Sequence, residues 1–417
     1  MGLSRVWTNL YPAAVTPCTA FPCPTFLTGI RKMDSRTREQ ADPVDMTRRL
    51  VRTPSVNPRL EKGGTGEAAV AELAADWLAG WGYETEITEV AAGRCNVVSR
   101  RGRGSGPSLL LNGHLDTVGV SGMTEPFSGA VREGRLYGRG AADMKSGVAC
   151  ILAVAADLAT EDIPGELIVA LTADEEHASI GMEALVASGA AADAAVVCEP
   201  TSLAVMPAHK GFLWIDVTVA GRAAHGSRPD AGVDAIAHMG HVLVAFEEEA
   251  ARLGRETGHA LLGPASLHAG TIKGGSAPSV YPDRCHLVVE RRTLPGETAA
   301  TVMGETERVM AAARRRCPAL EASVEPGLFR AATEVAVSSP LVHGLRRACA
   351  RAGVPGDVRG MSAWVDACFL NESGIPAVCF GPGSIAQAHT ADEWVGVAEI
   401  ETCARVLADF SRRFLTG

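Results

Sequence analysis

The sequence IVALTADEEHASIG, residues 168–181, begins as an apolar run and ends in consecutive acidic residues. Four of its first five residues are apolar, which is typical of a strand buried on both faces of a sheet. Asp174, Glu175 and Glu176 follow directly, and His177 comes next. A core strand that ends in adjacent carboxylates indicates that these side chains have a task at the edge of the sheet.

Apolar strand patterns and helical patterns alternate on both sides of this stretch. Strands are expected over 94–101, 108–116, 165–173 and 194–200, and helices over 146–159 and 181–189. Such an alternation predicts an α/β fold with a mostly parallel sheet.

The pattern changes near residue 207. In GFLWIDVTVAG, residues 211–221, apolar and polar side chains alternate with a period of two, as in a strand with one buried face. Two strand–helix halves follow, which predict a ferredoxin-like α+β domain, and the α/β pattern returns near residue 335. We therefore expect a catalytic domain in two parts, 41–206 and 326–417, with an inserted domain over 207–325. Residues 1–40 carry prolines at positions 12, 17, 22 and 24 and are expected to be a disordered leader or an upstream translation artefact, with Met33 as a more natural beginning.

Composition excludes several classes of function. A net charge of −9 argues against nucleic acid or an anionic membrane as partner. No apolar run reaches the roughly 18 residues of a membrane span. The eleven cysteines are scattered without a C-x-x-C pair, which favours buried thiols and a cytoplasmic location.

Metal-binding residue types gather where the predicted strands end. These are His114 and Asp116, Asp143, Glu175 and Glu176, Glu199, and His389 in AQAHTADEWV. The carboxyl ends of strands line the ligand crevice of an open α/β sheet, and carboxylates gathered there without a cation would repel one another. Two divalent cations would reverse this balance. The mixture of imidazole and carboxylate suits Zn²⁺, with Co²⁺ or Mn²⁺ as alternatives.

These motifs resemble the dinuclear-zinc metallopeptidases that include acetylornithine deacetylase, succinyl-diaminopimelate desuccinylase, aminoacylase and carboxypeptidase G. The resemblance runs from about residue 45 to 415. It implies that His114 and Glu199 hold one metal, that Glu176 and His389 hold the other, and that Asp143 bridges both. It also implies that Asp116 hydrogen-bonds the far nitrogen of His114 and that Glu175 is the general base.

The resemblance extends to the inserted segment. GRAAHGSRPDAGVDAI implies that His225 reaches the active site of a partner subunit in a homodimer, and VVERRTLPGE implies that Arg292 grips a substrate carboxylate. Arg291 is the alternative, since the alternation along the strand decides which of the two faces the substrate. Ser279 departs from the family pattern, which commonly has Asn there. GMSAWVDA lacks the Gly-Thr-Asp form, and Trp364 is either a core residue or part of an acyl pocket.

Each group also has a structural interpretation. Glu175 and Glu176 could form a solvated turn, and Asp143 could cap the helix that follows it.

Together the motifs favour a two-metal hydrolase that removes an acyl group from an N-acyl amino acid. The alternatives are a dipeptidase or carboxypeptidase of the same family, a hydrolase of carbamoyl amides, and a metal-free binding protein that retains the fold. A serine hydrolase is excluded because no G-x-S-x-G motif occurs.

Overall fold

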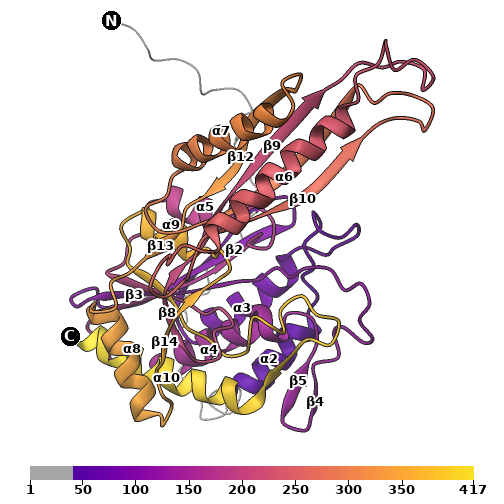
Figure 1. Ribbon diagram of the computed structural model, residues 1–417. Helices are drawn as coiled ribbons and strands as arrows, with labels where there is room; N and C mark the ends of the chain where they lie inside the picture. Colours follow the sequence, from indigo (N-terminus) through magenta and orange to yellow (C-terminus); the bar gives the residue numbers. More distant parts are fainter. Residues whose placement is uncertain (1–40) are drawn as a thin grey trace, which may run out of the picture. The chain divides into compact units, whose positions relative to one another are not determined.

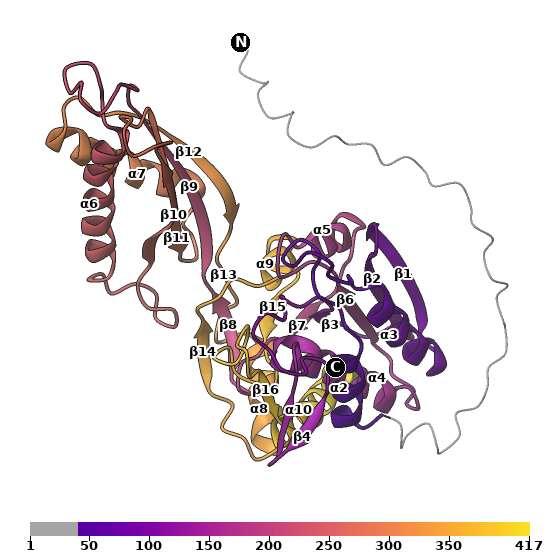
Figure 2. The same ribbon diagram turned by 90° about the vertical axis from the view of Figure 1, so that its right-hand side faces the viewer.

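The computed structural model describes residues 41–417, and the predicted leader over residues 1–40 lies outside them. Figures 1 and 2 show the described chain from two directions. Its strands form a nine-stranded central sheet, a four-stranded inserted sheet and a three-stranded sheet within that range.

The central sheet has its parallel strands in the middle. Its order is β1-β2-β6-β3-β7-β15-β8-β13, and β14 pairs with β8 outside this path. The bounds are β1 Glu84–Ala91, β2 Arg94–Gly102, β3 Ser108–His114, β6 Glu166–Thr172, β7 Ala194–Val197, β8 Val205–His209, β13 Thr333–Glu334, β14 Val358–Met361 and β15 Ala377–Cys379. Strands β6, β3, β7 and β15 run parallel, while β2 pairs with β6 in the antiparallel sense. The predicted α/β fold with a central parallel sheet is confirmed.

Helices cover both faces of the central sheet. On one face, Leu110 of β3 and Ile168 of β6 pack in a core cluster with α5 (Ile180–Ala187) and α9 (Ala367–Glu372). On the other face lies α4 (Ser146–Leu158), which packs against α10 (Val397–Thr416). Because β3 and β6 are covered on both sides, every residue after the first is buried in each strand. This explains the continuous apolar runs in the sequence.

The inserted sheet has the ferredoxin-like order β10-β11-β9-β12. Its elements are β9 Gly211–Ala220, α6 Ala235–Leu253, β10 Ser266–Gly274, β11 Arg284–Thr293, α7 Ala299–Arg316 and β12 Glu321–Arg330. The alternation in β9 matches its burial, since Leu213 is fully buried and Trp214 is 40% exposed. Helices α6 and α7 pack on the buried face (Figure 2). The predicted boundary at residue 325 falls inside β12, which continues to Arg330.

The remaining elements surround the central sheet. They are α2 Pro43–Arg52, α3 Ala68–Gly80, the short helical turn η1 Ala141–Lys145, α8 Pro340–Arg351, and the strands β4 Ala130–Arg132, β5 Arg135–Tyr137 and β16 Trp394–Gly396. None of the helices in the described part of the chain combines the length and the hydropathy needed to cross a bilayer.

Leu110 tests the contribution of the central core. Its side chain is fully buried between β3 and the helices of one face. Replacement by alanine should lower the free energy of unfolding by about 2–5 kcal/mol, because it removes buried contacts and leaves a cavity. Urea denaturation measures this change. The control is Leu60→Ala at a site that is 43% exposed, where a change within about 0.5 kcal/mol is expected. Equal effects at both positions would contradict the packing described above.

Candidate metal centre

Three neighbouring parallel strands end at one edge of the central sheet. His114 is the last residue of β3 and pairs with Thr172, the last residue of β6. Glu176 follows β6 after a short turn, and Glu199 follows β7 by two residues. We call this the carboxyl edge. It brings together side chains that lie far apart in the sequence, as expected for the ligand side of an α/β sheet.

Asp143 lies between two histidines. Its Oδ1 atom is 3.1 Å from Nε2 of His114, and its Oδ2 atom is 3.5 Å from Nε2 of His389. The residue belongs to η1 but has non-helical torsion angles, and Lys145 occupies the N-cap position of α4. Asp143 therefore does not cap that helix, and its carboxylate points to the carboxyl edge instead.

Glu176 and Glu199 complete the ligand cluster, which we define as His114, Asp143, Glu176, Glu199 and His389. Nε2 of His389 is 2.9 Å from Oε2 of Glu176. Ligand atoms of His114, Asp143 and Glu176 all lie within 4.8 Å of one another. Glu199 is buried, and its Oε1 atom has no hydrogen-bond partner among residues 41–417. The charges of His114, Asp143 and Glu176 act on Glu199. A buried carboxylate oxygen without a partner in such surroundings fits divalent cations of the zinc type.

The charges in the ligand cluster perturb one another strongly. Burial raises the pKa of Glu176 to about 7, and the negative charge of Asp143 adds to this shift. Burial likewise raises the pKa of Glu199 to about 8, with His114 opposing the shift. Hydrogen bonds with Asp143 and Glu176 raise the pKa of His389 to about 10. Protons alone therefore leave the ligand cluster with too little positive charge to balance its carboxylates.

Asp116 lies just beyond His114 and contacts it mainly through its backbone. Nδ1 of His114 is 3.0 Å from the carbonyl oxygen of Asp116 but 3.6 Å from its carboxylate Oδ1. The carboxylate instead accepts hydrogen bonds from the backbone N–H groups of Glu175 and Glu176 and from Nδ2 of Asn57. Asp116 thus orients His114 and also fixes the turn that carries Glu175 and Glu176.

Glu175 is held next to the ligand cluster. It is partly buried, and its backbone is tied to Asp116. Burial raises the pKa of Glu175 well above its ordinary value; the positive charge of His114 opposes this shift, and the negative charge of Glu199 adds to it. Glu175 therefore lies close to the candidate metal positions, in buried surroundings that carry negative charge. A solvated turn, the alternative interpretation, is not what these contacts describe.

His225 and Arg292 lie in the inserted segment, outside the ligand cluster. His225 is exposed, and its Nδ1 atom accepts a hydrogen bond from the backbone N–H of Ser227. Arg291 is buried and paired with Glu297 and Glu305. Arg292 is more accessible, bonds to Glu290 and lies over the ring of Phe212. The alternation along β11 therefore leaves Arg292 as the more accessible of the two arginines.

Several residues that support the site were not predicted from the sequence. Glu393 is buried and accepts hydrogen bonds from Arg139 and from the backbone N–H groups of Gly140, Ala142 and Asp143. It lies only four residues after His389, in the motif that identified that histidine. Its closeness to His389 could have identified Glu393 from the sequence, because a glutamate in a metal-binding motif that is not itself a ligand often orients the ligands.

Three further supporting residues are Glu67, Arg94 and Asn57. Arg94 forms a buried pair with Glu67 and contacts Asp174, and Asn57 joins Asp174 to Asp116. They come from separate segments near the amino end of the described chain. No local sequence motif marked them.

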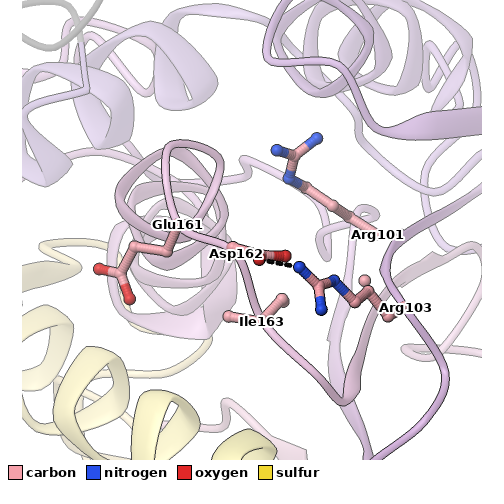
Figure 3. Close-up of a pocket in the computed structure, with 6 residues that line it drawn as sticks. Arg101, Arg103, Glu161, Asp162 and Ile163 are labelled. Atoms are coloured by element: carbon pink, nitrogen blue, oxygen red, sulfur yellow. Dashed lines mark hydrogen bonds and ion pairs between the residues drawn. The ribbon is translucent and has the colours of Figure 1, made fainter.

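A cavity lies at the opposite end of the strands of the central sheet. It has a volume of about 210 Å³ and is lined by Arg101, Gly102, Arg103, Glu161, Asp162 and Ile163 (Figure 3). Gly102 pairs with Glu166 at the amino end of β6, so this cavity is remote from the ligand cluster. Arg103 is paired with Asp162, and Arg101 donates to the carbonyl oxygens of Gly82 and Ala159. Most of these polar groups are thus paired within the protein, although Nε of Arg101 has no hydrogen-bond partner among residues 41–417.

A two-histidine, three-carboxylate cluster at the carboxyl edge of an α/β sheet defines a metallohydrolase type of site. Comparison with known proteins assigns the family: residues 110–413 match Peptidase family M20/M25/M40, and the chain belongs to it. The chain is therefore a hydrolase of amide bonds in a metal-dependent family.

Individual relatives agree with this assignment. The chain is 34% identical to the acetylornithine deacetylase of Myxococcus xanthus over 337 residues. This aligned region covers 79% of this chain and 87% of that protein. A tripeptidase from Staphylococcus aureus has the same fold, with a TM-score of 0.74 at 18% identity, over 90% of this chain and 98% of that one. A dinuclear metal-binding peptidase from Bacillus subtilis gives a TM-score of 0.69 at 17% identity, over 92% and 99% of the two chains.

Glu393 provides a test of how the Asp143 loop is held. Glu393→Gln should lower the free energy of unfolding by about 3–5 kcal/mol, because it leaves the buried charge of Arg139 without its partner. Urea denaturation measures the loss. The matched control is Glu401→Gln, on an exposed position of α10, for which a change within about 0.5 kcal/mol is expected. A loss at Glu393 as small as that of the control would contradict the account.

Proposed function

We propose that this protein is a dinuclear zinc-dependent deacylase that removes the acyl group from an N-acyl amino acid. The proposal depends mainly on the position of Asp143, whose two carboxylate oxygens face His114 and His389. A carboxylate in that position is suited to bridging two cations. The similarity to an acetylornithine deacetylase along most of the chain supports an N-acyl amino acid as substrate.

The ligand cluster divides into two metal positions. His114 and Glu199 would hold one ion, Glu176 and His389 the other, and Asp143 both. Zn²⁺ suits these donors, and Co²⁺ or Mn²⁺ are the alternatives. When bound, such a pair polarises the substrate carbonyl and lowers the pKa of water. The first position is deeply buried at His114, whereas the His389 side chain is 52% exposed.

Glu175 is the proposed general base. Its backbone is tied to Asp116 and burial raises its pKa, and a carboxyl group held in place beside the reacting atoms can relay a proton. It would accept a proton from the attacking water and deliver it to the leaving nitrogen.

His225 would donate a hydrogen bond to the carbonyl oxygen as negative charge develops on it. Nδ1 of His225 lies 2.8 Å from the hydroxyl oxygen of Ser227 and 3.2 Å from its backbone nitrogen. A neutral ring that accepts at Nδ1 would carry its proton on Nε2, which leaves Nε2 as the donor. The described contacts of His225 lie within the inserted segment. We therefore propose that it serves the site of a partner subunit, in a homodimer formed through the inserted sheet.

Arg292 would bind the substrate carboxylate, since a guanidinium can form two parallel hydrogen bonds to it. A cytoplasmic location is also proposed. It is supported by the nine cysteines of residues 41–417, which are all free thiols and mostly buried.

A substrate panel tests the proposed function. The purified chain is loaded with Zn²⁺, Co²⁺ or Mn²⁺ and assayed with N-acetyl, N-succinyl and N-carbamoyl amino acids and with dipeptides. The proposal expects the highest kcat/KM for an N-acyl amino acid. Preference for dipeptides would instead identify the protein as a dipeptidase or carboxypeptidase. Failure to bind any divalent ion would favour a metal-free binding protein.

Replacement of Glu175 separates catalysis from metal binding. Glu175→Gln keeps the shape of the side chain but removes the proton acceptor, so turnover should fall by ~10²–10⁴ while two ions remain bound. Steady-state kinetics and metal analysis of the same preparation measure both quantities. Turnover within threefold of the unmodified protein would remove Glu175 from its role.

Replacement of His225 tests catalysis across subunits. His225→Ala should lower kcat by roughly 10²-fold or more, as loss of a donor to the developing charge does, and the dimer should persist in analytical ultracentrifugation. Mixing this variant with Glu175→Gln should then recover about a quarter of the unmodified activity after subunit exchange, because half of a random mixture is heterodimer with one complete site. No recovery in a mixture shown to contain heterodimer would place His225 in its own subunit's site.

A further inference from the structure

The turn that delivers Glu175 and Glu176 pivots on Asp174. Asp174 has a positive φ of 69°, which ends β6 and redirects the chain. Its carbonyl oxygen accepts hydrogen bonds from the backbone N–H groups of His177, Ala178 and Ser179. The position of the proposed base and the neighbouring ligand therefore depends on how firmly Asp174 is held.

Arg94 holds Asp174 from behind the ligand cluster. Its Nη2 atom is 2.8 Å from Oδ1 of Asp174, and the same guanidinium donates two hydrogen bonds of 2.6 Å to Glu67. The backbone N–H of Asp174 in turn donates to Oε1 of Glu67, at 3.1 Å. Asp174 is thus fixed through both its side chain and its backbone by one buried ion pair.

Asn57 extends this support to Asp116. Its Nδ2 group donates to Oδ1 of Asp174 at 2.9 Å and to Oδ2 of Asp116 at 2.8 Å. Asp116 accepts the N–H groups of Glu175 and Glu176. A continuous set of hydrogen bonds therefore leads from Arg94 to the backbone of the proposed base and of a proposed ligand.

The charges give Arg94 a further task. Glu67, Asp116 and Asp174 are each at most 2% exposed, and Arg94 is 4% exposed. Buried carboxylates this close together repel one another unless a cation lies between them. Arg94 contacts two of the three directly. It binds Glu67 through planar bidentate geometry that a lysine cannot reproduce, and it binds Asp174 through Nη2.

We propose that Arg94 is a positioning residue for the hydrolysis: it holds Asp174, and through it the turn that places Glu175 and Glu176, without touching substrate. The proposal rests on the roles assigned to those two glutamates under the proposed function. Loss of Arg94 should therefore weaken metal binding and turnover together, because a single turn carries both the proposed ligand Glu176 and the proposed base Glu175.

The first experiment compares Arg94→Met and Arg94→Lys with the unmodified protein. Isothermal titration with Co²⁺ should show an affinity about 10–100-fold lower for Arg94→Met, the usual effect of losing a residue that supports a metal ligand. Arg94→Lys keeps the charge but not the bidentate geometry, and an intermediate loss is expected. Unchanged Co²⁺ affinity and kcat in folded Arg94→Met would overturn the proposal.

A double variant distinguishes positioning from general stability. Glu67→Met combined with Arg94→Met removes both charges of the pair, and such apolar replacement often restores stability that a single change loses. The positioning role predicts that the double variant regains its resistance to urea while Co²⁺ affinity and kcat stay at least tenfold low. Recovery of all three together would reduce Arg94 to a structural role. If Arg94→Met does not fold, the double variant and Arg94→Lys provide the same comparison.

The positioning role of Arg94 and the proposed function fail on different results. If the unmodified protein cleaves none of the N-acyl amino acids, the proposed function fails, and the Co²⁺ titration still tests Arg94. If the unmodified protein is active but both Arg94 variants bind Co²⁺ and turn over normally, the positioning role fails alone.

Discussion

The repulsion between carboxylates at the carboxyl edge is the constraint on which the rest of the structure depends. Asp116, Asp143 and Glu199 are buried there, and Glu176 lies beside them. Such a group is stable only when positive charge is close by. The fold supplies part of that charge through His114 and His389 within the ligand cluster and through Arg94 behind it. A pair of divalent cations supplies the remainder in the proposed enzyme.

The supporting carboxylates have a different task from the proposed ligands. Asp116 and Glu393 use their oxygens to accept backbone N–H groups from the loops that carry Glu176 and Asp143. Close packing adds to this control: a Cβ atom at Gly147 would lie 2.1 Å from the carbonyl oxygen of Cys198. The start of α4 therefore approaches the end of β7 at the residue before Glu199. Geometry at the site is set by the backbone as much as by the ligands.

The sequence predicted those parts of the fold whose signal is local. Strands β3, β6 and β7 are continuous apolar runs, and β9 alternates, because each pattern follows directly from burial on two faces or on one. Strand β12 continues to Arg330, past the predicted domain boundary at residue 325, and Pro326 and Gly327 interrupt its alternation. The strand-end histidines and carboxylates were also visible. Arg94, Asn57 and Glu67 were not, since only the folded chain brings these separate polar residues behind Asp174.

The inserted segment carries the part of the proposed mechanism that depends on a second subunit. His225 and Arg292 contact neighbours within that segment, whereas the ligand cluster belongs wholly to the central sheet and its loops. Anomalous diffraction at the zinc edge, from crystals grown with Zn²⁺, shows whether the ligand cluster holds a pair of ions. Two peaks about 3.5–4 Å apart are expected, one beside His114 and Glu199, the other beside Glu176 and His389, with Asp143 between them. Crystals saturated with Zn²⁺ that show no peak within reach of Asp143 would contradict the proposed pair of ions.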